Sequence, residues 1–97
     1  MIKRFVKLTF AQDNINEFLA IFEASKKLIR VSNGCRHLEL LQDTAQPNIF
    51  FTLSYWEGEE ALEMYRHSDL FISTWAKTKI LFSDKPQAWS ITVVSET

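Results

Sequence analysis

The chain has 97 residues, of which 46% are hydrophobic and 24% charged, and its formal net charge at pH 7 is -1. This length predicts one domain, residues 1–97, whose small core would gain from self-association. The basic residues form no stripe and no stretch is apolar enough to span a bilayer, so we expect neither a nucleic-acid partner nor a membrane one. Cys35 is the only cysteine, and the charged N-terminus does not resemble a signal peptide, which together favour a cytoplasmic protein.

Residues 2–10 alternate in a way that predicts a strand, and a stripe of apolar residues after Asn14 predicts a helix that ends near Arg30. Asn14 and Glu17 have the spacing of a capping box, in which each side chain bonds the other residue's backbone amide. Ser32-Asn33-Gly34 is expected to end this helix, with Gly34 as its left-handed terminator.

Residues 35–42 and 49–56 predict two more strands, and the short turn-rich connection between them favours an antiparallel hairpin. The second of these strands is apolar on both faces, with Phe50 and Trp56 on one side and Phe51 and Leu53 on the other. A strand of this kind is covered on both sides. In so short a chain, one cover must be its own helices, and we expect the other to be a second copy of the chain.

Two helical segments follow, with Gly58 and Ser68 as their expected N-caps. Phe71, Trp75 and Phe82 are predicted to share one face of the second segment, and a final strand begins near residue 88. The order predicts a ferredoxin-like α+β fold, βαββαβ, with a four-stranded antiparallel sheet and its helices on one face. A second sheet packed against the bare face would form a homodimer.

Several of these segments together resemble one known family, the antibiotic biosynthesis monooxygenases. The residues that carry the resemblance are Gly34-Cys35, Asp43 with Pro47-Asn48, the run Trp56-Glu57-Gly58-Glu59-Glu60-Ala61-Leu62, and Ser68 with Phe71. The resemblance covers nearly the whole chain and implies a dimeric α+β barrel. It also implies a choice of activities, because the family includes cofactor-free enzymes that oxidise anthrones or quinols, haem-degrading enzymes and chains with no known activity.

The resemblance carries over to individual residues only in part. Trp56 matches a functional position of the anthrone-oxidising members, but Thr52 stands where they have an asparagine and Leu62 where they have a tyrosine. The haem-degrading members have an iron-ligating histidine where this chain has Trp75. Haem degradation is therefore disfavoured, and the specific chemistry stays open.

The junction between the third strand and the following helix is the expected position of a pocket. Trp56 could stack there on a flat aromatic substrate, or could simply anchor the strand to the helix. Thr52 and Ser54 share its face and could line a wet cavity, or could bond the backbone at the thin edge of the core. The helix aromatics Tyr65, Phe71 and Trp75 should reach the same region, although helix aromatics are commonly plain core.

Proton transfer would need a titratable group in that pocket. Tyr65 could orient a substrate oxygen or move a proton, and His37 has the more suitable unperturbed pKa. Strict alternation places His37 on one strand face with Cys35 and Glu39, where a carboxylate could raise the pKa of the imidazole. The alternative is that this face meets solvent or the rim of a dimer. The chain has no spacing typical of metal ligands, so we expect no metal.

The resemblance and the residues together lead us to expect a homodimeric, cofactor-independent monooxygenase that oxidises a small electron-rich aromatic of the anthrone or quinol type. Such chemistry needs little from the protein, because a deprotonated substrate can itself pass an electron to oxygen. The alternatives are a non-catalytic dimer that binds a small apolar ligand, and a purely structural dimer. The expected catalytic residues are Trp56, His37 and Tyr65, and the expected pocket residues are Thr52, Ser54, Phe71 and Trp75.

Overall fold

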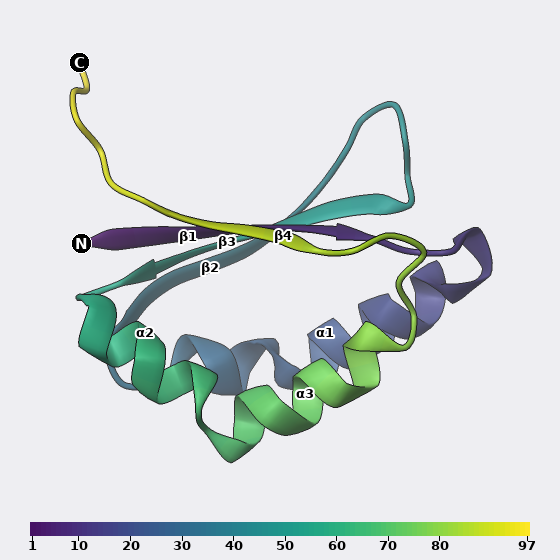
Figure 1. Ribbon diagram of the computed structural model, residues 1–97, viewed down its shortest axis with the longest axis horizontal. Coiled ribbons are helices and arrows are strands. Elements are labelled where there is room, and N and C mark those ends of the chain that lie inside the picture. The colour runs from purple at the N-terminus through teal and green to yellow at the C-terminus, as the bar shows by residue number, and fades with distance from the viewer.

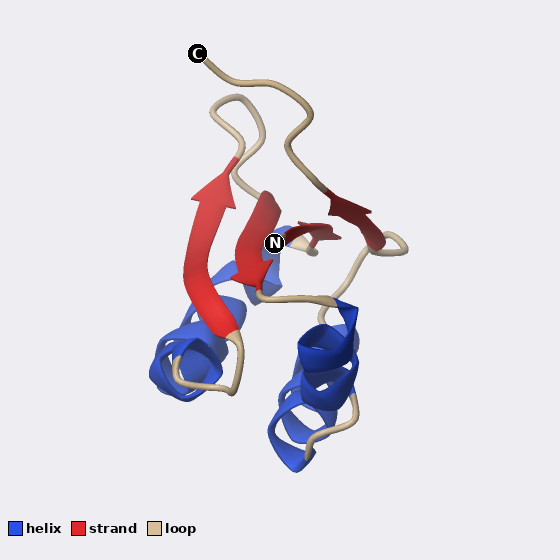
Figure 2. Cartoon of the chain, turned by 90° about the vertical axis from the view of Figure 1, so that its left-hand side faces the viewer, coloured by secondary structure: helices blue, strands red, loops and turns tan.

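The chain forms one antiparallel sheet with all of its helices on one face, as a computed structural model of residues 1–97 shows (Figures 1 and 2). The strands, in the spatial order β2-β3-β1-β4, are β1 (Ile2–Thr9), β2 (Cys35–Gln42), β3 (Ile49–Trp56) and β4 (Gln87–Ile91). The helices are a 3₁₀ turn (Gln12–Asn14), α1 (Ile15–Arg30), α2 (Glu59–Arg66) and α3 (Asp69–Lys79). This arrangement confirms the predicted ferredoxin-like α+β fold. No helix is both long and apolar enough to cross a membrane.

The register of the sheet decides which side chains face the helices. β1 and β3 pair Arg4 with Ser54 and Val6 with Thr52, so the even-numbered residues of both strands lie on the helix-covered face. The most buried residues on that side form two separate clusters. One cluster contains Leu8, Phe10, Phe18, Phe50 and Leu81, and the other contains Cys35, Trp56 and Leu62.

The odd-numbered residues lie on the other face of the sheet, which no helix covers (Figure 2). Phe5 and Phe51 stack there with ring centroids 5.1 Å apart, and Trp89 lies 6.2 Å from Phe5. Trp89 is 44% exposed, which is high for so large an aromatic side chain. β3 is therefore apolar on both faces, as predicted, but only one face is covered within the chain.

The predicted N-caps of the second and third helices are correct: Gly58 is the N-cap of α2, and Ser68 accepts a hydrogen bond from the backbone amide of Phe71. Gly34 has the predicted left-handed conformation, with a φ of +83°. It does not end the helix, however, because α1 ends at Arg30 with Val31 as its C-cap and Gly34 lies in the turn before β2.

Two further details of the helix predictions were wrong. Asn14 occupies the N-cap position of α1, but the predicted capping box does not form, because its side chain makes no capping hydrogen bond and instead donates to the carbonyl of Leu81. The helix α3 stops at Lys79, so Phe82 does not extend its stripe. Phe82 forms a β-bridge with Phe10 and stacks on its ring, which turns the chain back toward the sheet before β4.

Candidate functional site

A cavity of about 360 Å³ lies between the helices and the sheet, in the space between the two buried clusters. Thirteen of its 21 lining residues are hydrophobic, so its walls are mainly apolar. Six of the seven predicted site residues line it: Thr52, Ser54, Trp56, Tyr65, Phe71 and Trp75. The structure thus brings residues from β3, α2 and α3 together around one hollow.

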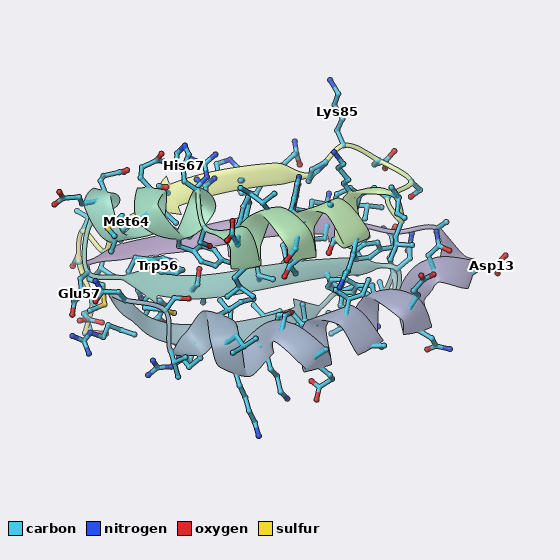
Figure 3. All side chains as sticks on the ribbon, turned by 90° about the horizontal axis from the view of Figure 1, so that it is seen from below. Asp13, Trp56, Glu57, Met64, His67 and Lys85 are labelled. Atoms are coloured by element: carbon cyan, nitrogen blue, oxygen red, sulfur yellow. The ribbon has the colours of Figure 1, made fainter.

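Trp56 forms one end wall of the cavity, where β3 passes into α2. Its side chain is 1% exposed, and its indole Nε1 donates a 2.9 Å hydrogen bond to Ser54 Oγ. In Figure 3 Trp56 lies inward of α2, whereas His67 at the end of that helix points outward. Because the indole N–H already has an acceptor, Trp56 offers a ligand its ring rather than a hydrogen-bond donor.

A row of four aromatic rings runs along the helical side of the cavity. Tyr65 stacks on Trp56 at 4.8 Å, meets Phe71 edge to face at 5.3 Å, and Phe71 in turn stacks on Trp75 at 5.8 Å. Such a row presents flat apolar surface, which suits a planar aromatic ligand.

Tyr65 is the one tyrosine in that row. Burial, with a smaller contribution from Cys35, raises the pKa of its hydroxyl to about 12. The phenol therefore remains protonated at neutral pH. It can donate a hydrogen bond to a ligand oxygen but is a poor general base.

The other hydroxyl groups of the lining are mostly engaged within the protein. Ser25 and Thr78 donate to the helix carbonyls of Ile21 and Thr74, and Ser54 accepts from Trp56. Thr52 faces the cavity from the middle of β3, opposite Val6 of β1. Thr52, Tyr65 and Thr74 are therefore the lining residues whose hydroxyls have no hydrogen-bond partner within the protein.

His37 is the predicted site residue that does not reach the cavity. It pairs with Tyr55 on the bare face of the sheet, where the two rings are 4.6 Å apart. Its Nε2 lies 3.6 Å from the carboxylate of Glu39, so these two residues share a face as predicted. A proton-transfer role inside the cavity has no geometric support for His37.

Cys35 and His37 lie on opposite faces, and the prediction that they share one was wrong. The register shifts between them, so that Arg36 is an extra residue in a β-bulge. Cys35 is consequently buried on the helix side, opposite Trp56, and burial raises the pKa of its thiol. Strict alternation does not hold across a bulge.

Two arginines of the cavity lining were not predicted. Arg4 projects from β1 and Arg66 from the last turn of α2, and they are the only charged residues in the lining. Arg4 Nη1 donates to Ser90 Oγ at 3.0 Å, and Arg66 pairs with Glu63 at 2.8 Å. The sequence carried a signal for Arg4, because it has the same parity as Val6 and so belongs to the covered face.

The sequence profile of the family described as "Antibiotic biosynthesis monooxygenase" matches residues 1–76, which is more than half of the chain. The protein belongs to this family. No curated protein sequence matches the chain.

Solved structures of similar fold agree with this assignment. A crystal structure of an antibiotic biosynthesis monooxygenase superposes with a TM-score of 0.92 at 16% identity, covering 98% of this chain and 100% of the other. A conserved protein from Methanosarcina mazei Go1 gives 0.89 at 18% identity, covering 93% and 89%. Rv0793 from Mycobacterium tuberculosis gives 0.89 at 16% identity, covering 98% and 96%. At these identities the likeness concerns the fold alone.

The three positions on which the resemblance to the anthrone-oxidising members was judged all line the cavity: Thr52, Trp56 and Leu62.

Proposed function

We propose that this antibiotic biosynthesis monooxygenase family protein is a homodimeric, cofactor-independent monooxygenase that oxidises a small electron-rich aromatic of the anthrone or quinol type. The observation that carries the proposal is the mainly apolar cavity of about 360 Å³ with its row of four aromatic rings. That volume is near the lower end of the range for small-molecule sites, roughly 300–1,000 Å³. A planar compound of two or three fused rings fits such a space.

The proposed chemistry is driven by the substrate. An anthrone loses a proton to become an electron-rich anion, which passes one electron to O₂, and the resulting radicals join in a carbon–oxygen bond. The peroxide anion formed in this way takes up a proton to become a hydroperoxide, which eliminates water and leaves a carbonyl. One oxygen atom enters the product and the other leaves as water. Trp56 would hold the ring, and the protonated Tyr65 would donate a hydrogen bond to the reacting oxygen.

The homodimer is proposed from the bare face of the sheet. Phe5, Phe51 and Trp89 form an aromatic patch there that the chain itself does not cover. Two such sheets packed face to face, about 10 Å apart, would bury both patches. The lone reduced Cys35 fits the cytoplasm, where we place the dimer.

Oxygen uptake with a panel of anthrones and hydroquinones, without added flavin or metal, tests the activity. We expect consumption of one O₂ per substrate by the wild type and a loss of at least about tenfold in Tyr65→Phe, since one hydrogen bond to the reacting oxygen is removed. The exposed His67→Gln is the matched control and should keep full activity. His37→Gln should also keep it, because His37 lies across the sheet from the cavity.

The second candidate is a non-catalytic dimer that binds a small aromatic molecule. One observation favours it: the only titratable groups in the lining are Arg4, Arg66 and the protonated Tyr65, and none of these is a suitable base near neutral pH. Quenching of tryptophan fluorescence by the same compounds, with no oxygen consumption from any of them, would establish binding without turnover.

A further inference from the structure

Arg4 and Arg66 put two positive charges on a cavity whose lining contains no carboxylate. The nearest acidic side chains, Glu59 and Glu63, belong to the exposed side of α2, and Glu63 pairs with Arg66 from outside the cavity. Their charges favour the cationic form of Arg4, although burial and the positive charge of Arg66 together lower its pKa. Arginine side chains in general are cationic at any physiological pH.

Arg4 has hydrogen-bonding capacity left over. A guanidinium carries five N–H donors, and Arg4 uses one of them on the hydroxyl of Ser90 rather than on a carboxylate. It also lies within reach of the like charge of Arg66, which opposes its own ionisation. An anion placed between the two arginines would accept the free donors and relieve this repulsion.

The two arginines lie where a ligand can enter. Ala88 and Ser90 of β4 lie on the helix side of the sheet, opposite Val6 and Arg4, yet both residues are exposed. The helices therefore leave the β4 edge of that face uncovered, and Pro86 and Ala88 line the cavity there. The apolar aromatic row occupies the interior, and the charge lies toward the open edge.

We propose that the cavity binds an aromatic oxyanion, with its ring against the row from Trp56 to Trp75 and its charged oxygen between Arg4 and Arg66. The proposal deepens the proposed function, because it assigns the chemical class of ligand that the same cavity takes. The negative oxygen could belong to a carboxylate substituent, or to the ring itself as a phenolate or enolate. In the second case the arginines also replace the missing base, because they stabilise the anion while its proton leaves to solvent.

Equilibrium binding of a matched pair of probes tests the charge. We expect 2-naphthoate to bind at least about tenfold more tightly than neutral 2-naphthamide, as one charge-assisted hydrogen bond would produce. Arg4→Gln and Arg66→Gln should each remove most of this preference, because they weaken the binding of 2-naphthoate much more than that of 2-naphthamide, whose carbonyl accepts only an uncharged hydrogen bond. Arg36→Gln is the control, because Arg36 is exposed, pairs with Glu57 and is absent from the lining. Arg4→Lys keeps the charge and should retain part of the preference.

A phenol probe distinguishes the two sources of the oxyanion. The visible absorbance of 4-nitrophenolate reports the ionisation of the bound compound, and its apparent pKa should fall on binding to the wild type but not to Arg4→Gln. A lowered phenol pKa with no preference for naphthoate assigns the charge to the ring oxygen, whereas preference for naphthoate alone assigns it to a carboxylate. Either result supports the proposal.

Equal affinities for naphthoate and naphthamide together with an unshifted phenol pKa would overturn the proposal, as would the absence of binding by all three probes. So would a charge preference that survives in both glutamine variants. These readouts do not depend on turnover. Arginine-dependent binding without oxygen uptake would support the oxyanion site and contradict the monooxygenase. Oxygen uptake with neither a preference for naphthoate nor a lowered phenol pKa would contradict the oxyanion site and support the monooxygenase.

Discussion

Trp56 and Ser54 are joined side chain to side chain by a 2.9 Å hydrogen bond on the buried face of β3, two residues apart along the strand. The bond fixes the orientation of the indole ring that closes one end of the cavity. The buried indole N–H of Trp56 therefore depends on one hydroxyl group, that of Ser54, as its acceptor. A polar residue in the middle of an apolar strand is thereby explained.

Replacing Ser54 by Ala should lower the free energy of unfolding by about 1–3 kcal/mol, because the indole N–H would remain buried without an acceptor. Urea denaturation followed by tryptophan fluorescence measures the change. Ser73→Ala, which removes an exposed hydroxyl from α3, is the control and should stay within about 0.5 kcal/mol of the wild type. Equal effects of the two substitutions would contradict the assigned role of Ser54.

The raised pKa of Tyr65 predicts a loss of stability in alkali. The unfolded chain releases this proton near pH 10, whereas the folded protein keeps it to about pH 12. Between these values the unfolded chain binds fewer protons than the folded protein, so the free energy of unfolding falls as the pH rises. The fall attributable to Tyr65 is on the order of 2–3 kcal/mol, and none of it is present below pH 10.

Urea denaturation at several pH values between 9 and 12 checks this prediction, with Tyr65→Phe as the test variant. The variant should lose less stability than the wild type over the same interval. Tyr55→Phe removes a phenol from the opposite face of the sheet and leaves Tyr65 in place, so it should retain the steep fall. Parallel profiles of Tyr65→Phe and the wild type would show that folding does not raise the pKa of this hydroxyl.

Gly34→Ala should destabilise the protein for two separable reasons. The backbone φ of +83° costs a residue with a Cβ about 1–2 kcal/mol. The new Cβ would also lie 2.5 Å from the Cβ of Ala61, which is too close for two carbon atoms. Adding Ala61→Gly should restore the steric part of the loss and leave the backbone part, a difference that a double-mutant cycle measures.

Gly58→Ala is the matched glycine control. A Cβ at Gly58 meets nothing within 4 Å, and the φ of −175° is an extended conformation open to any residue. We expect less than about 1 kcal/mol of destabilisation, which reflects only the weaker N-cap preference of Ala. A larger effect here than at Gly34 would contradict the steric account.

The proposed dimer predicts that Phe51→Arg yields a monomer. A charge in the centre of the stacked Phe5–Phe51 patch would be buried without a partner if two sheets met there. Sedimentation at micromolar concentration should give twice the chain mass for the wild type and the single chain mass for the variant. Ile80→Arg, at an exposed apolar residue after α3, should remain dimeric. A wild type that sediments as a monomer would remove the proposed dimer.

The parts of the fold and site that the sequence revealed are those that depend on regular spacing. Alternation in residues 49–56 assigned Thr52, Ser54 and Trp56 to one face, and helical periodicity brought Tyr65 and Trp75 toward it. The fold class followed from the order of the elements. These patterns are local, and the sheet and helices preserve them.

The features that sequence reasoning missed depend on pairing and volume. The bulge at Arg36 arises from how β2 pairs with β3. Its sign in the sequence is that Cys35 and Leu38, which both lie on the helix side, are separated by three residues rather than by an even number. Arg4 was not predicted, although its parity placed it on the covered face. The cavity exists because the two buried clusters do not fill the space between the helices and the sheet. The periodicity of the sequence carries no information about that volume.

The bulge at Arg36 leaves the two faces of β2 independent of that residue. Cys35 and His37 pair with the neighbouring residues Trp56 and Tyr55, so Arg36 alone interrupts the alternation. A chain shortened by Arg36 would alternate regularly and would keep Cys35, Leu38 and Leu40 on the helix side and His37 and Glu39 on the bare face. A single-codon deletion at this position would therefore remove the bulge and the ion pair of Arg36 with Glu57 without exchanging the apolar and ionisable surfaces of the strand.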